Sequence, residues 1–215
     1  GLSFLDAITA LAPYRSQVID GGPEPVKDHS IFSPPPRNPC NSRAIAYLLK
    51  TRRIKPDVLF PLIRKGLVYE SVDTHNVVSL GRDSNGKDRY AFERSSASCS
   101  SVKFETRGSD KRYSFTLGSV ADSGVVMAFE SCIDILSFLS LPDTIKPPGA
   151  AYVSLGGLTD IALERHAAAD PKCEIILCLD NDKAGADAAD RLRAKWLSVG
   201  HYVSQFVPGA KDCNA

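Results

Sequence analysis

Long apolar runs, paired cysteines and an excess of one charge are all missing from the 215-residue sequence. No apolar run approaches the roughly 20 residues that a membrane-spanning helix needs, and no signal peptide is visible, so we expect no membrane association. The net charge of +1 neither supports nor excludes a nucleic-acid partner, because basic side chains can still cluster locally.

The six cysteines are scattered, with no C-x-x-C pair and few histidines nearby. This spacing argues against a zinc site within the chain and against a secreted disulfide framework. We therefore expect free thiols and a cytoplasmic location. The chain starts without a methionine and stops just after Asn214, so we expect it to be a fragment of a longer protein.

The amino-terminal part of the sequence divides into a linker and a small subdomain. Residues 1–41 combine a short amphipathic pattern with a polar, proline-rich stretch, which predicts an N-terminal helix and an extended linker. Residues 42–118 first show helical periodicity, with Pro56 at the start of the second helix, and then strand patterns at 77–80 and 89–92. We predict a small mixed α/β subdomain over 42–118.

Residues 119–215 alternate between strand and helix patterns. The strand patterns fall at 124–129, 151–155, 174–179 and 201–207, and the helical patterns at 131–141, 158–169 and 184–197. Strands that alternate with helices of this length imply a parallel sheet with right-handed crossover connections. The predicted fold class is therefore α/β, a mostly parallel sheet flanked by helices, preceded by the small mixed subdomain.

Acidic residues follow three of these strand patterns. Glu130 ends the first strand, and Asp180 and Asp182 end the third. Asp134 lies one helical turn beyond Glu130, and Asp212 follows the last strand. Open α/β sheets place ligands at the carboxyl ends of their strands, and converging carboxylates suit a hard cation such as Mg²⁺. The alternative is that these are unrelated acids of surface loops.

Two sets of motifs carry a resemblance to known proteins. The first set is Glu130 with Asp134, then Leu179-Asp180-x-Asp182-x-x-Gly185 and Lys211-Asp212-x-Asn214. It resembles the Toprim domain shared by bacterial DnaG-type primases, type IA and type II topoisomerases and some nucleases. The Lys-Asp-x-Asn ending is similar to that of Toprim proteins of plasmids, phages and other mobile elements.

The second set lies upstream and resembles the amino-terminal half of a primase catalytic core. It consists of Tyr47-Leu48 followed by Arg53-Ile54, Gly81-Arg82-Asp83-x-x-Gly86, Phe92-x-Arg94 and Gly108-Ser-Asp-Lys111. The resemblance implies a Rossmann-like Toprim domain over 119–215 and a primase-type subdomain before it. The sequence departs from the family pattern at Arg52-Arg53, where Arg-Gly is usual, and at Cys213, where an aromatic residue is common.

The resemblance implies a role for each candidate residue. Glu130 would be the general acid or base at the transferred nucleotide. Asp180 and Asp182 would hold Mg²⁺ or Mn²⁺, and Asp134 and Asp212 would assist. The basic residues that would contact nucleotide or nucleic acid are Arg82, Arg94, Lys111, Arg112, Lys183 and Lys211. The alternative for these basic residues is solvated surface charge.

The function that the resemblance implies is a primase-like nucleotidyltransferase. It would join nucleoside triphosphates on a single-stranded DNA template, with a replicative helicase or relaxase module as a further partner. Two alternatives stay open: a metal-dependent Toprim nuclease, and a non-catalytic nucleic-acid-binding module of a mobile-element replication protein. A topoisomerase is not expected, because no tyrosine-bearing cleavage domain fits in the remaining residues.

Overall fold

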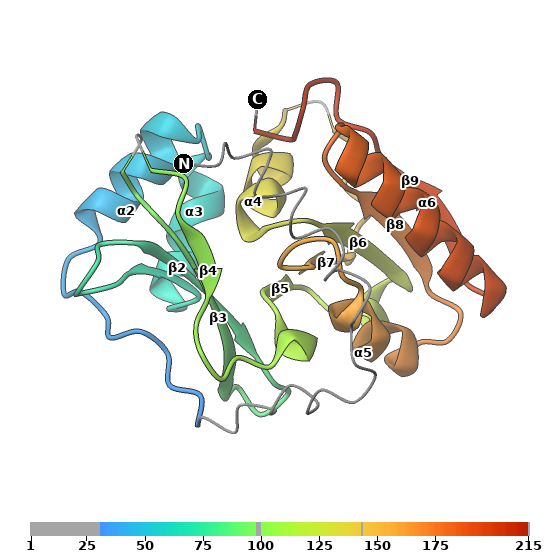
Figure 1. Ribbon diagram of the computed structural model, residues 1–215, viewed down its shortest axis with the longest axis horizontal. Helices are drawn as coiled ribbons and strands as arrows, with labels where there is room; N and C mark the ends of the chain where they lie inside the picture. Colours follow the sequence, from blue (N-terminus) through green and yellow to red (C-terminus); the bar gives the residue numbers. More distant parts are fainter. Residues whose placement is uncertain (1–30, 98–99, 143, 215) are drawn as a thin grey trace, which may run out of the picture.

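The computed structural model describes residues 31–97, 100–142 and 144–214 (Figure 1). The helix predicted at 1–14 and most of the predicted linker lie outside the described residues. The described chain forms two sheets, a four-stranded sheet of order β1-β2-β3-β4 and a five-stranded sheet of order β5-β7-β6-β8-β9. Figure 1 shows them side by side, as a first lobe (42–105) and a second lobe (116–205).

The first lobe starts with helices and continues into an antiparallel sheet. Its helices are α2 (Ser42–Ala46), the π-helix η2 (Tyr47–Thr51) and α3 (Pro56–Arg64). Its strands are β1 (Val68–Glu70), β2 (Val77–Arg82), β3 (Asp88–Arg94) and β4 (Lys103–Glu105). Pro56 is at the first turn of α3, as predicted, and the helix runs through Pro61.

The second lobe has the predicted alternation of strands and helices. Its strands are β5 (Thr116–Leu117), β6 (Val125–Phe129), β7 (Ala151–Ser154), β8 (Glu174–Cys178) and β9 (Tyr202–Gln205). Its helices are α4 (Cys132–Ser140), α5 (Ile161–Ala169) and α6 (Lys183–Ser198), and the 3-10 turns η3 (Lys111–Tyr113) and η4 (Val120–Asp122) precede them. Strands β7, β6, β8 and β9 are parallel, so the predicted α/β class is confirmed. Strand β5 lies before the predicted division at 118/119, yet it pairs with β7 of the second lobe.

Alternating side chains of β6 separate two cores. Val126 and Ala128 pack in a cluster with residues of α5 and α6. Met127 and Phe129 point to the other face and pack in a cluster that includes α4 and also Leu48 and its neighbours in the first lobe. Because this second cluster is shared by both lobes, apolar burial fixes one lobe against the other. None of the described helices is long and apolar enough to cross a bilayer.

Arg53, two residues beyond the end of the π-helix η2, has an unusual backbone conformation. Its φ of 54° lies in the left-handed region, which residues other than glycine rarely adopt. Glycine is usual at this position in the family that the sequence resembles. The side chain of Arg53 is exposed, so the strain comes from the backbone conformation of this residue and not from packing of its side chain.

Replacing Arg53 with glycine should therefore stabilise the fold. The left-handed conformation costs about 1–2 kcal/mol, and the extra freedom of glycine in the unfolded chain offsets about 0.5–1 kcal/mol of that. We expect Arg53→Gly to raise the free energy of unfolding by about 0.5–1 kcal/mol in urea titrations with an unchanged m value. The matched control is Arg193→Gly on the exposed side of α6, which should lower it by about 1 kcal/mol. Destabilisation by both changes would contradict the assignment of strain at Arg53.

Candidate functional site

A cavity of about 450 Å³ lies between the lobes, at the carboxyl ends of β6 and β8. One wall is formed by the second lobe and the other by the face of the first sheet that carries Val77, Ser79, Phe92 and Arg94. The charged side chains that line it are Arg52, Arg94, Lys103, Glu105, Glu130, Asp134, Asp180, Lys211 and Asp212. Open α/β sheets bind ligands at this end of their strands.

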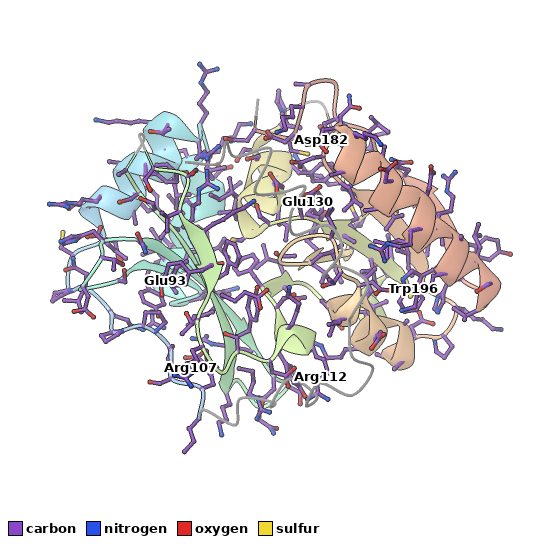
Figure 2. All side chains as sticks on the ribbon, in the orientation of Figure 1. Glu93, Arg107, Arg112, Glu130, Asp182 and Trp196 are labelled. Atoms are coloured by element: carbon purple, nitrogen blue, oxygen red, sulfur yellow. The ribbon has the colours of Figure 1, made fainter. Side chains whose placement is uncertain are left out.

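Glu130 follows β6 directly and sits between the two lobes (Figure 2). Its Oε1 accepts a hydrogen bond from the backbone N–H of Asp180 at 3.1 Å, so the ends of β6 and β8 are joined through this side chain. Burial raises the pKa of Glu130 to about 7, and the negative charges of Asp180, Asp134 and Asp182 add to the rise. A carboxyl group with this pKa is half protonated near neutral pH and can both donate and accept a proton.

Asp134 lies in the first turn of α4 and has a structural partner. Its carboxylate accepts from the backbone N–H of Ser131 at 3.0 Å and from the Ser131 hydroxyl at 2.7 Å, while Ser131 caps the helix in return. Burial raises the pKa of Asp134 to about 6. The sequence prediction placed Asp134 on the same side as Glu130, and both residues line the cavity.

Asp180 and Asp182 have different environments although they are two residues apart. Burial raises the pKa of Asp180, and the charges of Asp212 and Asp182 act in the same direction. Asp182 is instead the N-cap of α6, and its Oδ1 accepts from the Gly185 N–H at 3.0 Å. That hydrogen bond is the main reason why the pKa of Asp182 is lowered. Asp180 lines the cavity, whereas Asp182 stands beside it at the start of α6 (Figure 2).

Gly185 has a packing role at this turn. A Cβ atom at position 185 would lie 2.1 Å from the carbonyl oxygen of Asp180, which is a backbone clash. The absence of a side chain therefore allows the first turn of α6 to pack directly on the end of β8. The Asp180-x-Asp182-x-x-Gly185 spacing thus shapes the site as well as supplying its acids.

The candidate basic residues divide into two groups. Arg94 and Lys211 line the cavity, and Lys211 Nζ lies 3.6 Å from Asp182 Oδ2. The other four are outside the cavity lining and have acidic partners near them: Arg82 with Asp88, Lys111 with Glu105, Arg112 with Asp110 and Lys183 with Asp187. Lys111 also donates to the carbonyl oxygen of Gly156, a cavity residue.

Three features of the site escaped the sequence analysis. Lys103 pairs with Arg94 across β3 and β4, and both side chains face the cavity. Arg52 reaches it from the end of η2. Gly156 and Gly157 form a turn after β7, and the N–H of Gly157 donates to the carbonyl oxygen of Glu130 at 3.0 Å. Knowledge of the pairing between β3 and β4 would have identified Lys103 as a site residue, because it lies opposite Arg94 and opposite side chains share one face of a sheet.

A divalent cation fits the chemistry of these donors. Within the described part of the chain, no three His, Cys, Asp or Glu side chains are arranged to enclose a metal ion by themselves. Mg²⁺, however, uses one or two carboxylates and keeps several waters. Glu130, Asp134 and Asp180 all have raised pKa values, with burial as the first cause and neighbouring negative charge as another. A hard cation would relieve this repulsion.

Comparisons with known proteins agree with this description. Residues 127–215 match the family model described as Toprim-like, and residues 46–121 match that of a protein family of unknown function, DUF3991. No curated protein matches the sequence.

Three solved structures illustrate the similarity of fold. The primase fragment of the bacteriophage T7 primase-helicase protein has a TM-score of 0.57 and 22% identity, over 77% of this chain and 66% of that one. A chain from the bacteriophage T7 lagging-strand DNA polymerase structure with primase domains bound to an RNA/DNA hybrid and dTTP has a TM-score of 0.53 and 22% identity, over 77% and 81%. The RNA polymerase domain of the Mycobacterium tuberculosis primase has a TM-score of 0.50 and 18% identity, over 80% and 70%.

The chain thus spans just under two thirds of the T7 primase fragment. Its second lobe contains the predicted carboxylates at the carboxyl ends of a parallel sheet, and its first lobe supplies the opposite wall of the cavity. Residues 127–215 thus form a Toprim-like domain, and the fold of the chain resembles that of the primase domains in these structures.

Proposed function

We propose that this protein is a primase-like nucleotidyltransferase that joins nucleoside triphosphates on a single-stranded DNA template. The observation that supports it best is the pairing of two opposite walls in one cavity. Glu130 and Asp180 lie on the Toprim wall, and Arg94 and Lys103 face them from the first sheet. Acids on one side suit proton transfer and cation binding, and bases on the other suit phosphate groups.

In the proposed reaction, the 3′-hydroxyl oxygen of the growing strand attacks the α-phosphorus of the incoming nucleotide. A phosphodiester bond forms, the bond from the α-phosphorus to the bridging oxygen breaks, and pyrophosphate leaves. The hydroxyl proton passes to Glu130, whose pKa of about 7 leaves about half of the carboxyl groups ionised at neutral pH. Most of the remaining catalysis is positioning and charge stabilisation.

The Toprim acids would hold the divalent cation. Asp180 and Asp182 are the proposed ligands, assisted by Asp134 and Asp212. When bound, Mg²⁺ or Mn²⁺ would neutralise part of the negative charge on the phosphate group that is transferred. Asp182 Oδ1 is used by the cap of α6, and Oδ2 lies 3.6 Å from Lys211 Nζ, so Oδ2 is the atom that Asp182 would offer to a cation.

Basic side chains from both walls of the cavity would hold nucleic acid and nucleotide. Arg94, Lys103 and Lys211 can contact phosphate groups from the cavity, and the Nε of Arg94 has no hydrogen-bond partner in the described structure. Phosphate contacts release counterions, so binding of single-stranded DNA should weaken with added salt. The four basic residues outside the cavity lining would contribute mainly to the positive electrostatic potential around it: Arg82, Lys111, Arg112 and Lys183. A replicative helicase or relaxase module would be the replication partner, and the cytoplasm the place of action.

Loss of the Toprim acids should strongly slow primer synthesis. We expect Glu130→Gln and the double change Asp180→Asn/Asp182→Asn each to reduce the rate by about 10²–10⁴-fold, because one removes the proton acceptor and the other the cation ligands. The measurement is incorporation of labelled nucleotides on single-stranded DNA with Mg²⁺ or Mn²⁺. Asp190→Asn, on the exposed side of α6, is the matched control and should keep the wild-type rate.

Each alternative function has its own signature in this assay. Metal-dependent shortening of the template, lost in the same variants, would replace the primase proposal with a nuclease. Binding of the template without synthesis or cleavage, at every metal concentration, would identify a non-catalytic nucleic-acid-binding module.

The acid cluster should make the metal-free protein less stable as pH rises. The folded pKa of Glu130 is about 7 and its ordinary value is 4.5, so the native state binds more protons than the unfolded state between these values, and stability is lost as pH rises through about 7. In EDTA, we expect Glu130→Gln to flatten the decline of Tm between pH 5.5 and 8 and to be more stable than wild type at pH 8 by roughly 1–2 kcal/mol, after allowance for solvent screening. Asp190→Asn should follow the wild type, and a Tm of Glu130→Gln that declines as steeply as wild type would refute the raised pKa.

A further inference from the structure

The segment 208–214 borders the cavity without belonging to a helix or strand. It carries Lys211 and Asp212, two of the charged cavity residues. Asn181, between the two Toprim aspartates, holds one side of it: the backbone N–H of Asn181 donates to the carbonyl oxygen of Lys211 at 2.6 Å, and its Nδ2 donates to that of Pro208 at 3.3 Å.

Asn214 holds the other side of this segment. Its Nδ2 donates to the carbonyl oxygen of Arg52 at 2.5 Å and to the hydroxyl of Ser137 at 2.9 Å, and its Oδ1 accepts from Arg52 Nη1 at 3.0 Å. Its backbone N–H donates to Asp212 Oδ1 at 2.7 Å. One side chain therefore joins the segment to the end of η2 in the first lobe and to α4 in the second.

Arg52 is itself a fixed partner. Its Nε donates to the hydroxyl of Tyr47 at 2.8 Å, and its guanidinium lies 5.3 Å from the centre of the Tyr47 ring. Tyr47 is buried in the core that both lobes share. Tyr47 and Arg52 thus provide a fixed anchor for Asn214.

We propose that Asn214 is a positioning residue that fixes Asp212 and Lys211 beside Asp180, and so sets the affinity of the site for a divalent cation. The charges of Asp212 and Lys211 both act on Asp180, in opposite directions, so displacement of the segment changes the electrostatics of the acid cluster. The effect on cation affinity rests on the proposed function, whereas the fixing of the segment does not.

The chemistry of the contacts requires an amide. The three side-chain hydrogen bonds use two donors and one acceptor on neighbouring atoms, and only asparagine supplies these at this length. Aspartate keeps the acceptor for Arg52 but loses both donors, and alanine loses all three groups.

The fixing of the segment can be tested without metal by hydrogen exchange. In Asn214→Ala, the amide of Asn181 should exchange about tenfold faster or more, because its acceptor on Lys211 is no longer held. The amide of Ala128, in the middle strand β6, should be unchanged. Asn85→Ala, in the exposed turn between β2 and β3, is the matched control. Unchanged exchange at Asn181, or equal acceleration at Ala128, would overturn the proposal.

The consequence for the cation can be tested with Mn²⁺ and electron paramagnetic resonance. We expect Asn214→Ala to weaken Mn²⁺ binding by about 10-fold or more, as is usual when a residue that orients a ligand is lost. Asn214→Asp should be intermediate. In an Asp212→Asn/Lys211→Ala background, Asn214→Ala should add less than about twofold, because both charges through which it acts are already removed.

The outcomes separate the two proposals. If the wild type binds no Mn²⁺, the metal-dependent function fails, while the exchange of the Asn181 amide still decides whether Asn214 fixes the segment. If the wild type binds Mn²⁺ and Asn214→Ala weakens binding equally in both backgrounds, Asn214 does not act through Asp212 and Lys211, and the positioning role is wrong.

Discussion

The apolar cluster shared by the two lobes is the constraint on which the rest of the structure depends. Met127 and Phe129 on one face of β6 pack together with α4 and with Leu48 and Leu59 of the first lobe. This burial presses the face of an antiparallel sheet against the carboxyl ends of a parallel one. The cavity, its acidic wall and its basic wall all follow from that contact, because neither wall alone encloses a site. Hydrophobic packing thus determines where the charges meet.

The same packing makes the ionised forms of the acids that it brings together less stable. Glu130, Asp134 and Asp180 are partly removed from water and lie close to one another, and each has a raised pKa for that reason. Hydrogen bonds offset part of this cost, from Ser131 to Asp134 and from the Asp180 amide to Glu130. The acid cluster therefore lowers the stability of the folded state, which is common where residues are arranged for catalysis or binding.

Much of the second lobe could be predicted from the sequence because its signals are long and periodic. Buried strands such as 174–178 read as continuous apolar runs, and the acids that follow them mark the strand ends. Strands β1 and β5 were missed because they have only three and two residues, too few to show a periodic pattern. They are defined by their pairing with β2 and β7. Lys103 was missed for the same reason. Helix α5 begins at Ile161, later than predicted, after a turn with two glycines at positive φ. Asp182 was expected to be only a ligand, although its place just before a helix also suits a cap.

The contact between Asn214 and Arg52 joins residues that are 162 positions apart. During synthesis, the first lobe and most of the second leave the ribosome well before Asn214 does, and domains generally fold as they emerge. Both walls of the cavity can therefore assemble around an incomplete set of charges. The order of translation delays completion of the site until the segment 208–214 is in place, so a nascent chain could adopt the fold before all the charged residues of the site are present.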